Sequence, residues 1–166
     1  MGAFRMTDMD LIVWRHADAG DAEADSASDA GRRLTERGRK QAERMARWLQ
    51  ARLPERYTVL SSPAARARET AEALGAKVHV DARLGPGADV AHCMAALDWP
   101  QGPETRWRHV VLVGHQPTLG RLVSLLLSGE EADWSVKKGA IWWLTTRERE
   151  GCAQVVLRAA ISPDLA

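Results

Sequence analysis

Cysteine is scarce in this chain, with two residues, Cys93 and Cys152, among 166. The two cysteines lie far apart and form no Cys-x-x-Cys pair, so the sequence contains no pattern for a disulfide framework. Sparse, unpaired cysteines are typical of proteins from a reducing compartment. We therefore expect buried thiols without a functional role and a cytoplasmic protein.

The chain also lacks an excess of charge of either sign and lacks long hydrophobic runs. Its 23 basic and 22 acidic residues leave a formal net charge of +1, which gives no electrostatic reason to expect nucleic acid or a membrane surface as a partner. No apolar run approaches the ~20 residues of a membrane-spanning helix. Residues 1–10 have no apolar centre of the signal-peptide kind, and Met6 stands where a myristoylation signal has Ser or Thr.

Several catalytic and cofactor motifs are missing as well. The sequence has no Walker-type Gly-x-x-x-x-Gly-Lys-Ser/Thr, no Gly-x-Gly-x-x-Gly and no His-Glu-x-x-His. It also has no Gly-x-Ser-x-Gly elbow. His, Cys, Asp and Glu are not grouped at metal-ligand spacing. We therefore expect neither a cofactor nor a metal ion, and a chemistry that depends on other side chains.

What the sequence does contain is an alternation of short apolar runs and helical patterns. Hydrophobic residues make up 45% and charged residues 27%, which is ordinary for a globular domain. The pattern predicts strands over 11–14, 57–61, 77–80, 109–114, 141–146 and 153–161, helices over 35–53, 62–74, 90–97 and 117–128, and loops over 21–31, 81–89 and 101–108. Ser62 is expected to cap its helix with Pro63 at the first position, and the last two strands to form a hairpin around the turn 147–151. This order predicts one α/β domain over 1–166, with a mainly parallel sheet and an antiparallel edge.

Four polar residues fall at the carboxyl ends of these strands or at the helix starts that follow: Arg15, His16, Arg66 and His115. Ligands bind at this edge of open α/β sheets. Taken singly, His16 could merely fill a strand end and Arg66 could pair with a surface acid. Together they can surround a tetrahedral dianion, because arginine binds anions through its planar fork of donors. An imidazole beside a fixed positive charge stays neutral, and His16 could then attack as a nucleophile.

Three motifs carry a resemblance that covers most of the chain. They are, in order, Arg15-His16-Ala17, Ser62-Pro63-Ala64-Ala65-Arg66-Ala67-Arg68-Glu69-Thr70-Ala71 and Val113-Gly114-His115-Gln116-Pro117. Their order and separation resemble the histidine phosphatase superfamily, whose fold resembles phosphoglycerate mutase. Further segments resemble its SixA branch, the phosphohistidine phosphatases: Arg33-Leu34-Thr35 with Gly38, Gly87-Ala88-Asp89-Val90, and Lys138-Gly139-Ala140-Ile141.

The resemblance implies a three-layer α/β/α sandwich around a mixed sheet. It implies that His16 becomes phosphorylated and that Arg15, Arg66 and His115 bind the phosphoryl oxygens or another oxyanion. The chain departs from the family at Ala17, where much of the superfamily has glycine. It is also too short between Leu74 and His109 for the large cap insertion of many members.

The missing cap matters because many members carry a Glu or Asp general acid near it. The loop 84–89 contains no glutamate, which leaves Asp18 and Asp89 as candidate proton donors; each could equally cap a helix or bind backbone. An imidazole leaving group protonated on its other nitrogen needs less acid assistance than an alkoxide. We therefore expect a metal-independent phosphatase acting on phosphohistidine in a protein. The alternatives are a small-molecule phosphomonoesterase with an open site and a non-catalytic module that binds phosphoproteins.

Overall fold

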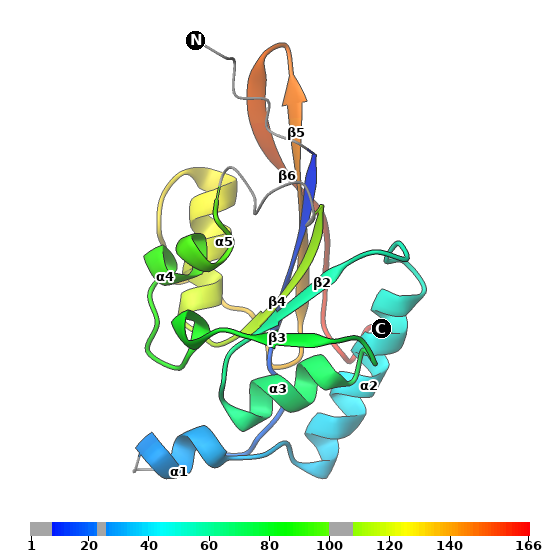
Figure 1. Ribbon diagram of the computed structural model, residues 1–166, viewed down its shortest axis with the longest axis vertical. Coiled ribbons are helices and arrows are strands. Elements are labelled where there is room, and N and C mark those ends of the chain that lie inside the picture. The colour runs from blue at the N-terminus through cyan, green and yellow to red at the C-terminus, as the bar shows by residue number, and fades with distance from the viewer. Residues whose placement is uncertain (1–7, 23–25, 100–107) are drawn as a thin grey trace.

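The computed structural model describes residues 8–22, 26–99 and 108–166, and a six-stranded sheet forms its centre (Figure 1). The strands are β1 (Met9–Arg15), β2 (Thr58–Ser61), β3 (Val78–Val80), β4 (His109–Gly114), β5 (Ile141–Arg149) and β6 (Cys152–Ile161). They are ordered β3-β2-β4-β1-β5-β6. Strands β1 to β4 pair in parallel, whereas β5 is antiparallel to β1, and β6 is antiparallel to β5. The predicted mixed sheet, mainly parallel with an antiparallel edge, is confirmed.

Helices cover both faces of the sheet, as Figure 1 shows. They are α1 (Ser26–Gly31), α2 (Glu36–Gln50), α3 (Ala65–Glu72), α4 (Val90–Ala96) and α5 (Thr118–Ser128), with a short 3₁₀ helix at Ala82–Leu84. Successive side chains of a strand point to opposite faces. Leu11 and Val13 of β1 accordingly pack in the core beneath α4 and α5, while Ile12 and Trp14 pack beneath α2 and α3. The predicted three-layer α/β/α sandwich is therefore confirmed.

The clearest error of the sequence prediction concerns the segment 21–31, which was expected to be a surface loop with solvated acids. Its second part is helix α1, residues Ser26–Gly31. Asp29 of this helix accepts hydrogen bonds from Arg32 and from Arg66 of α3. The segment has no apolar periodicity, and the partner in α3 is distant in sequence, so local pattern gave no sign of the helix.

Other differences are shifts of boundaries. Helix α2 is shorter than the predicted 35–53, because Thr35 caps it by accepting from the Gly38 N–H. Helix α3 begins later than predicted, at Ala65, and the prediction of Ser62 as its N-cap was wrong, because the N-cap is Ala64. The Ser62 hydroxyl instead accepts from the Ala64 N–H within the preceding turn. The hairpin strands run further than expected and leave a turn at 150–151. Both turn residues have positive φ, the geometry of tight hairpin turns, which Gly151 adopts readily.

One close backbone contact positions the chain that follows β1. A Cβ atom at Gly38 would lie 1.9 Å from the carbonyl oxygen of Asp18. Only glycine allows this approach, so the first turn of α2 packs directly against the segment after His16. Helix α2 thereby fixes the position of the backbone at Asp18.

Three further expectations concern membrane-spanning helices, the segments 1–10 and 101–108, and the two cysteines. No described helix is both long enough and apolar enough to span a membrane. The predicted loop 101–108 lies, except for Arg108, outside the described residues, as does most of the segment 1–10. Both cysteines are free thiols, but Cys152 is exposed at the start of β6 and only Cys93 is buried, so the expectation of two buried thiols was wrong for Cys152.

Candidate active site

The two central strands bring two histidines side by side. Strands β1 and β4 pair in parallel with Arg15 opposite Gly114, so the residues that follow, His16 and His115, leave the sheet at the same edge. Their ring centroids are 5.1 Å apart, with the planes tilted by 54°. The side chains are 5% and 6% exposed. This edge is the one at which the sequence predicted a site.

His16 is a neutral imidazole with a free nitrogen. Its Nδ1 atom lies 2.8 Å from the carbonyl oxygen of Ala17. A carbonyl only accepts hydrogen bonds, so Nδ1 carries the proton and Nε2 keeps its lone pair. Burial, together with the charges of Arg66 and Arg15, lowers the pKa of His16 to about 4, against the opposing effect of the hydrogen bond to Ala17. No described residue bonds to Nε2, which leaves that atom available as a nucleophile.

His115 is held by the turn before α3. Its Nε2 atom lies 2.7 Å from the Ser62 hydroxyl oxygen. When Ser62 donates to Nε2, the proton of the neutral ring resides on Nδ1, an atom that is buried and has no partner among the described residues. Burial, followed by the neighbouring His16 and Arg66, lowers the pKa of His115 to about 3. The ring can therefore donate a hydrogen bond without carrying a charge.

Two arginines complete the group. Arg66, in the first turn of α3, is 4% exposed; its two terminal nitrogens donate to the backbone oxygen of Asp29 at 2.7 Å and to the Asp29 carboxylate at 3.0 Å. Arg15, at the end of β1, donates to the backbone oxygen of Val136 at 2.8 Å. In both side chains the Nε atom is buried and has no partner among the residues that the structure describes. The guanidinium groups are thus fixed by their outer nitrogens.

The unpaired donors are concentrated at this place. Four buried side-chain polar atoms lack a partner in the described structure, and three of them are Arg15 Nε, Arg66 Nε and His115 Nδ1. An unpaired buried donor costs about 1–3 kcal/mol. Such a cost at one place indicates a ligand that accepts hydrogen bonds and carries negative charge. The geometry therefore suits an oxyanion beside the free Nε2 of His16.

The sequence matches a known family around these residues. Residues 11–87 fit the model of the histidine phosphatase superfamily (branch 1). The phosphohistidine phosphatase SixA of Escherichia coli (strain K12) is 34% identical over 128 residues, which are 74% of this chain and 76% of SixA. This chain belongs to the histidine phosphatase superfamily, in its SixA-type branch.

Comparison with solved structures extends the similarity over nearly the whole chain. The protein histidine phosphatase SixA complexed with tungstate is 30% identical and superimposes with a TM-score of 0.69, covering 94% of this chain and 98% of that one. A protein from Nakamurella multipartitia, assigned as a SixA phosphohistidine phosphatase, is 27% identical with a TM-score of 0.72, covering 95% and 97%. The layers described above are therefore those of SixA structures.

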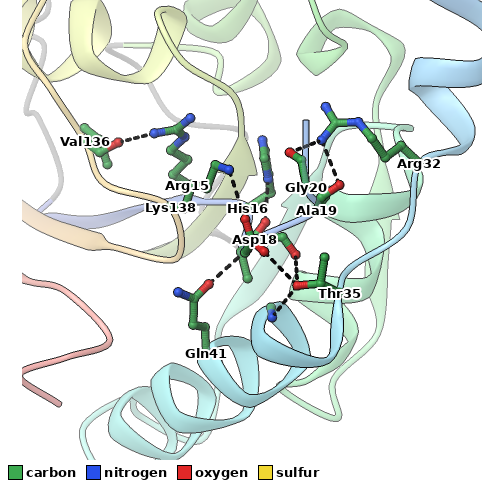
Figure 2. A network of polar contacts seen from close by, with 12 residues as sticks. Arg15, His16, Asp18, Ala19, Gly20, Arg32, Thr35, Gln41, Val136 and Lys138 are labelled. Carbon is green, nitrogen blue, oxygen red and sulfur yellow. Dashed lines mark hydrogen bonds and ion pairs between the residues drawn. The ribbon is translucent and has the colours of Figure 1, made fainter. Parts of the chain in front are cut away.

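The two candidate proton donors lie in different surroundings. Asp18 follows the site histidine and binds Lys138 Nζ at 2.9 Å and the Thr35 hydroxyl at 2.7 Å (Figure 2). These hydrogen bonds hold the pKa of its carboxyl below the ordinary value. Asp89 caps helix α4 and is exposed; hydrogen bonds from the backbone and ring of His92 lower its pKa as well. Both carboxyls thus favour the ionised form.

Three contributors to the site were missed in the sequence. Asp29 holds Arg66, Ser62 bonds to His115 instead of capping α3, and Val136 holds Arg15 through its carbonyl. Burial would raise the pKa of Asp29, but Arg32 and Arg66 together lower it below the ordinary value. Asp29 and Arg32 form an ion pair at a spacing of three residues, but a single such pair does not predict a helix.

Proposed function

We propose that this chain is a phosphatase that removes the phosphoryl group from a phosphohistidine in a protein, through a covalent intermediate on His16. The observation that carries the proposal is the free Nε2 of a neutral, buried imidazole beside three unpaired buried donors. Similarity to SixA, a phosphohistidine phosphatase, supports the substrate class. A SixA structure complexed with tungstate supports the binding of an oxyanion by this chain.

In the first step, Nε2 of His16 attacks phosphorus and the phosphorus–nitrogen bond of the substrate breaks. The bonding electrons return to the substrate imidazole, which leaves neutral because its other nitrogen already carries a proton. Arg15, Arg66 and His115 stabilise the charge on the equatorial oxygens, the main requirement of phosphoryl transfer. Water then attacks the phosphorus atom, and the bond between phosphorus and Nε2 of His16 breaks. The bonding electrons return to Nε2 as its lone pair, and the two protons of the water go to the released phosphate and the solvent.

Positive charge for this reaction comes from arginine in our proposal, and no metal ion or cofactor is required. Among the described residues, no three His, Cys, Asp or Glu side chains are grouped closely enough to hold a metal ion. Arg15 and Arg66 are already fixed in place by backbone and carboxylate oxygens. Pre-positioned charge of this kind stabilises a transition state without reorganisation.

We also propose a single domain over the whole chain and a cytoplasmic location. Between α3 and β4 the described chain forms only β3, the 3₁₀ helix and α4, which supports a site without a large cap. The free thiols of Cys93 and Cys152 support a reducing compartment.

The test compares leaving groups. Because Asp18 and Asp89 favour the ionised form, the rate should follow leaving-group quality. A phosphohistidine peptide should have a much higher kcat/KM than the matched phosphoserine peptide, with an aryl phosphate between them. If the small protonated fraction of either carboxyl still delivers a proton, Asp18→Asn or Asp89→Asn should slow the ester more than the phosphohistidine, since only an alkoxide must be protonated. Equal kcat/KM for both peptides in the parent enzyme would favour a general phosphomonoesterase, and binding without turnover would favour a phosphoprotein-binding module.

A further inference from the structure

A basic cleft opens next to the catalytic arginine. It encloses about 650 Å³ and is lined by Arg15 and Asp18, by Arg37 of α2, by Lys137 and Lys138, and by Asp164 near the carboxyl terminus. Arg15 belongs to both places, because its terminal nitrogen bonds to Val136, directly before the two lysines (Figure 2). A substrate whose phosphoryl group reaches His16 must therefore have its neighbouring atoms close to this cleft.

The charges that line the cleft are not balanced. Four basic side chains face two acids, and both acids have partners within the protein. Asp18 binds Lys138 and Thr35, and Asp164 accepts from the Ser162 hydroxyl. Lys137 acts on Asp164 only through its charge, which contributes to the lowered pKa of that carboxyl. Arg37 and Lys137 are exposed, and their side chains form no hydrogen bond or ion pair within the described structure, so two cations remain available to a ligand.

The cleft is also longer than a small phosphate ester needs. Beyond Arg37 it meets a second hollow of about 520 Å³ over α2, which shares Gln41 and Asp164 and is lined further by Lys40 and Arg44. Lys40 pairs with Glu36 in the same helix, and Arg44 donates to the backbone of Pro163. Arg37 thus lies where the two hollows meet, and Lys137 lies in the hollow that holds Arg15, so the unpaired cations line a continuous surface that can accommodate a polypeptide.

We propose that Arg37 and Lys137 form a specificity site that binds acidic side chains flanking the phosphohistidine of the protein substrate. The inference rests on the proposed function and adds to it how the substrate protein, the carrier of the phosphohistidine, is recognised. Asp or Glu side chains near the phosphohistidine are attracted by the positive charges of this cleft. Exposed pairs of this kind are individually weak, so they select among carriers and do not replace the phosphoryl contacts.

The test uses two phosphohistidine peptides of the same length, one with Asp and Glu beside the phosphohistidine and one with Asn and Gln. The parent enzyme should have a kcat/KM about fivefold to tenfold higher for the acidic peptide, mainly through KM, since each exposed ion pair contributes up to about 1 kcal/mol. In the double variant Arg37→Gln, Lys137→Gln this ratio should fall to about one, and in the double variant Arg37→Glu, Lys137→Glu it should invert. Raising the salt concentration should reduce the ratio in the parent enzyme.

The matched control is Arg147→Gln, Arg149→Gln, which removes the same charge from exposed positions on the hairpin and should keep the ratio of the parent enzyme. Equal kcat/KM for the two peptides in the parent enzyme, or a loss of preference in the control, would overturn the specificity site alone. Turnover of an aryl phosphate with neither peptide cleaved would overturn the proposed function together with it. A phenylene bisphosphate that depends on Arg37 and Lys137 more than the acidic peptide does would show that the cleft serves a small molecule instead.

Discussion

The two ends of the central strands β1 and β4 differ in whether their polar side chains are paired by hydrogen bonds. At the amino ends, Asp10 bonds to His109 at 3.0 Å, to Arg158 at 3.3 Å and to the Thr145 hydroxyl. At the carboxyl ends, three buried atoms, Arg15 Nε, Arg66 Nε and His115 Nδ1, have no partner in the described structure. Each end thus has histidine and arginine, yet only one end satisfies them. The comparison teaches that residue type alone does not mark a site, whereas unpaired donors gathered at one place do.

Removing His16, the proposed nucleophile, should give the largest difference in activity between the two ends. We expect His16→Ala to lower kcat/KM by at least about a thousandfold, as losses of covalent nucleophiles do, while the melting temperature falls little. His109→Ala is the matched change at the other end and should leave kcat/KM unaltered. Acid and alkali quenching of enzyme labelled with phosphate should give an acid-labile, alkali-stable adduct in the parent. An adduct that survives acid would contradict phosphorylation of His16.

Arginine substitutions should give the next largest contrast. Arg66→Lys keeps the charge but loses the planar fork, and we expect kcat/KM to fall about a hundredfold, the usual cost of one lost transition-state donor. Arg158→Lys makes the same change in an ion pair whose arginine is 52% exposed, so activity should not change. Steady-state kinetics on one aryl phosphate measures both. Comparable losses in the two variants would remove the distinction between the ends.

The amino ends should dominate stability instead. Asp10→Ala leaves a half-buried histidine and a threonine hydroxyl without their acceptor, which should lower the free energy of unfolding by about 1–3 kcal/mol. Its kcat/KM at a temperature where the fold persists should equal that of the parent. Chemical denaturation, with Arg158→Gln as a milder control, checks this expectation. A variant as stable as the parent but less active would show that Asp10 acts on the site.

Acid should lower the free energy of unfolding through the two histidines at the carboxyl ends, by a smaller amount for each histidine. His16 and His115 have pKa values of about 4 and about 3, below the 6.5 of the unfolded chain. As pH falls from 6.5, the unfolded state gains protons that the folded state does not bind, so stability decreases until pH approaches the folded values. Each histidine should contribute about 1 kcal/mol of this loss between pH 6.5 and 5.5. Denaturation curves of His16→Asn should show a shallower decline, and an unchanged slope would contradict the lowered pKa.

Much of this arrangement could be predicted because it depends on local pattern. The run 109–114 is uniformly apolar after its first residue, and the structure gives β4 the same bounds. Polar residues directly after such runs had to meet at one edge, since the strands are parallel. What remained hidden depends on distant partners. Asp29 meets Arg66 from 37 residues away, and Val136 holds Arg15 with a backbone carbonyl, an atom that every residue possesses.

The unpaired donors have a consequence for the end of the catalytic cycle. Inorganic phosphate, the product, offers Arg15 Nε, Arg66 Nε and His115 Nδ1 the same acceptor oxygens as the substrate's phosphoryl group. When phosphate leaves, these buried donors lose their hydrogen-bond acceptors, and the free energy of the protein rises by the cost of unpaired buried donors. Release of phosphate is therefore uphill, and free phosphate should both inhibit turnover competitively and raise the melting temperature. The enzyme is built to be slowed by its own product.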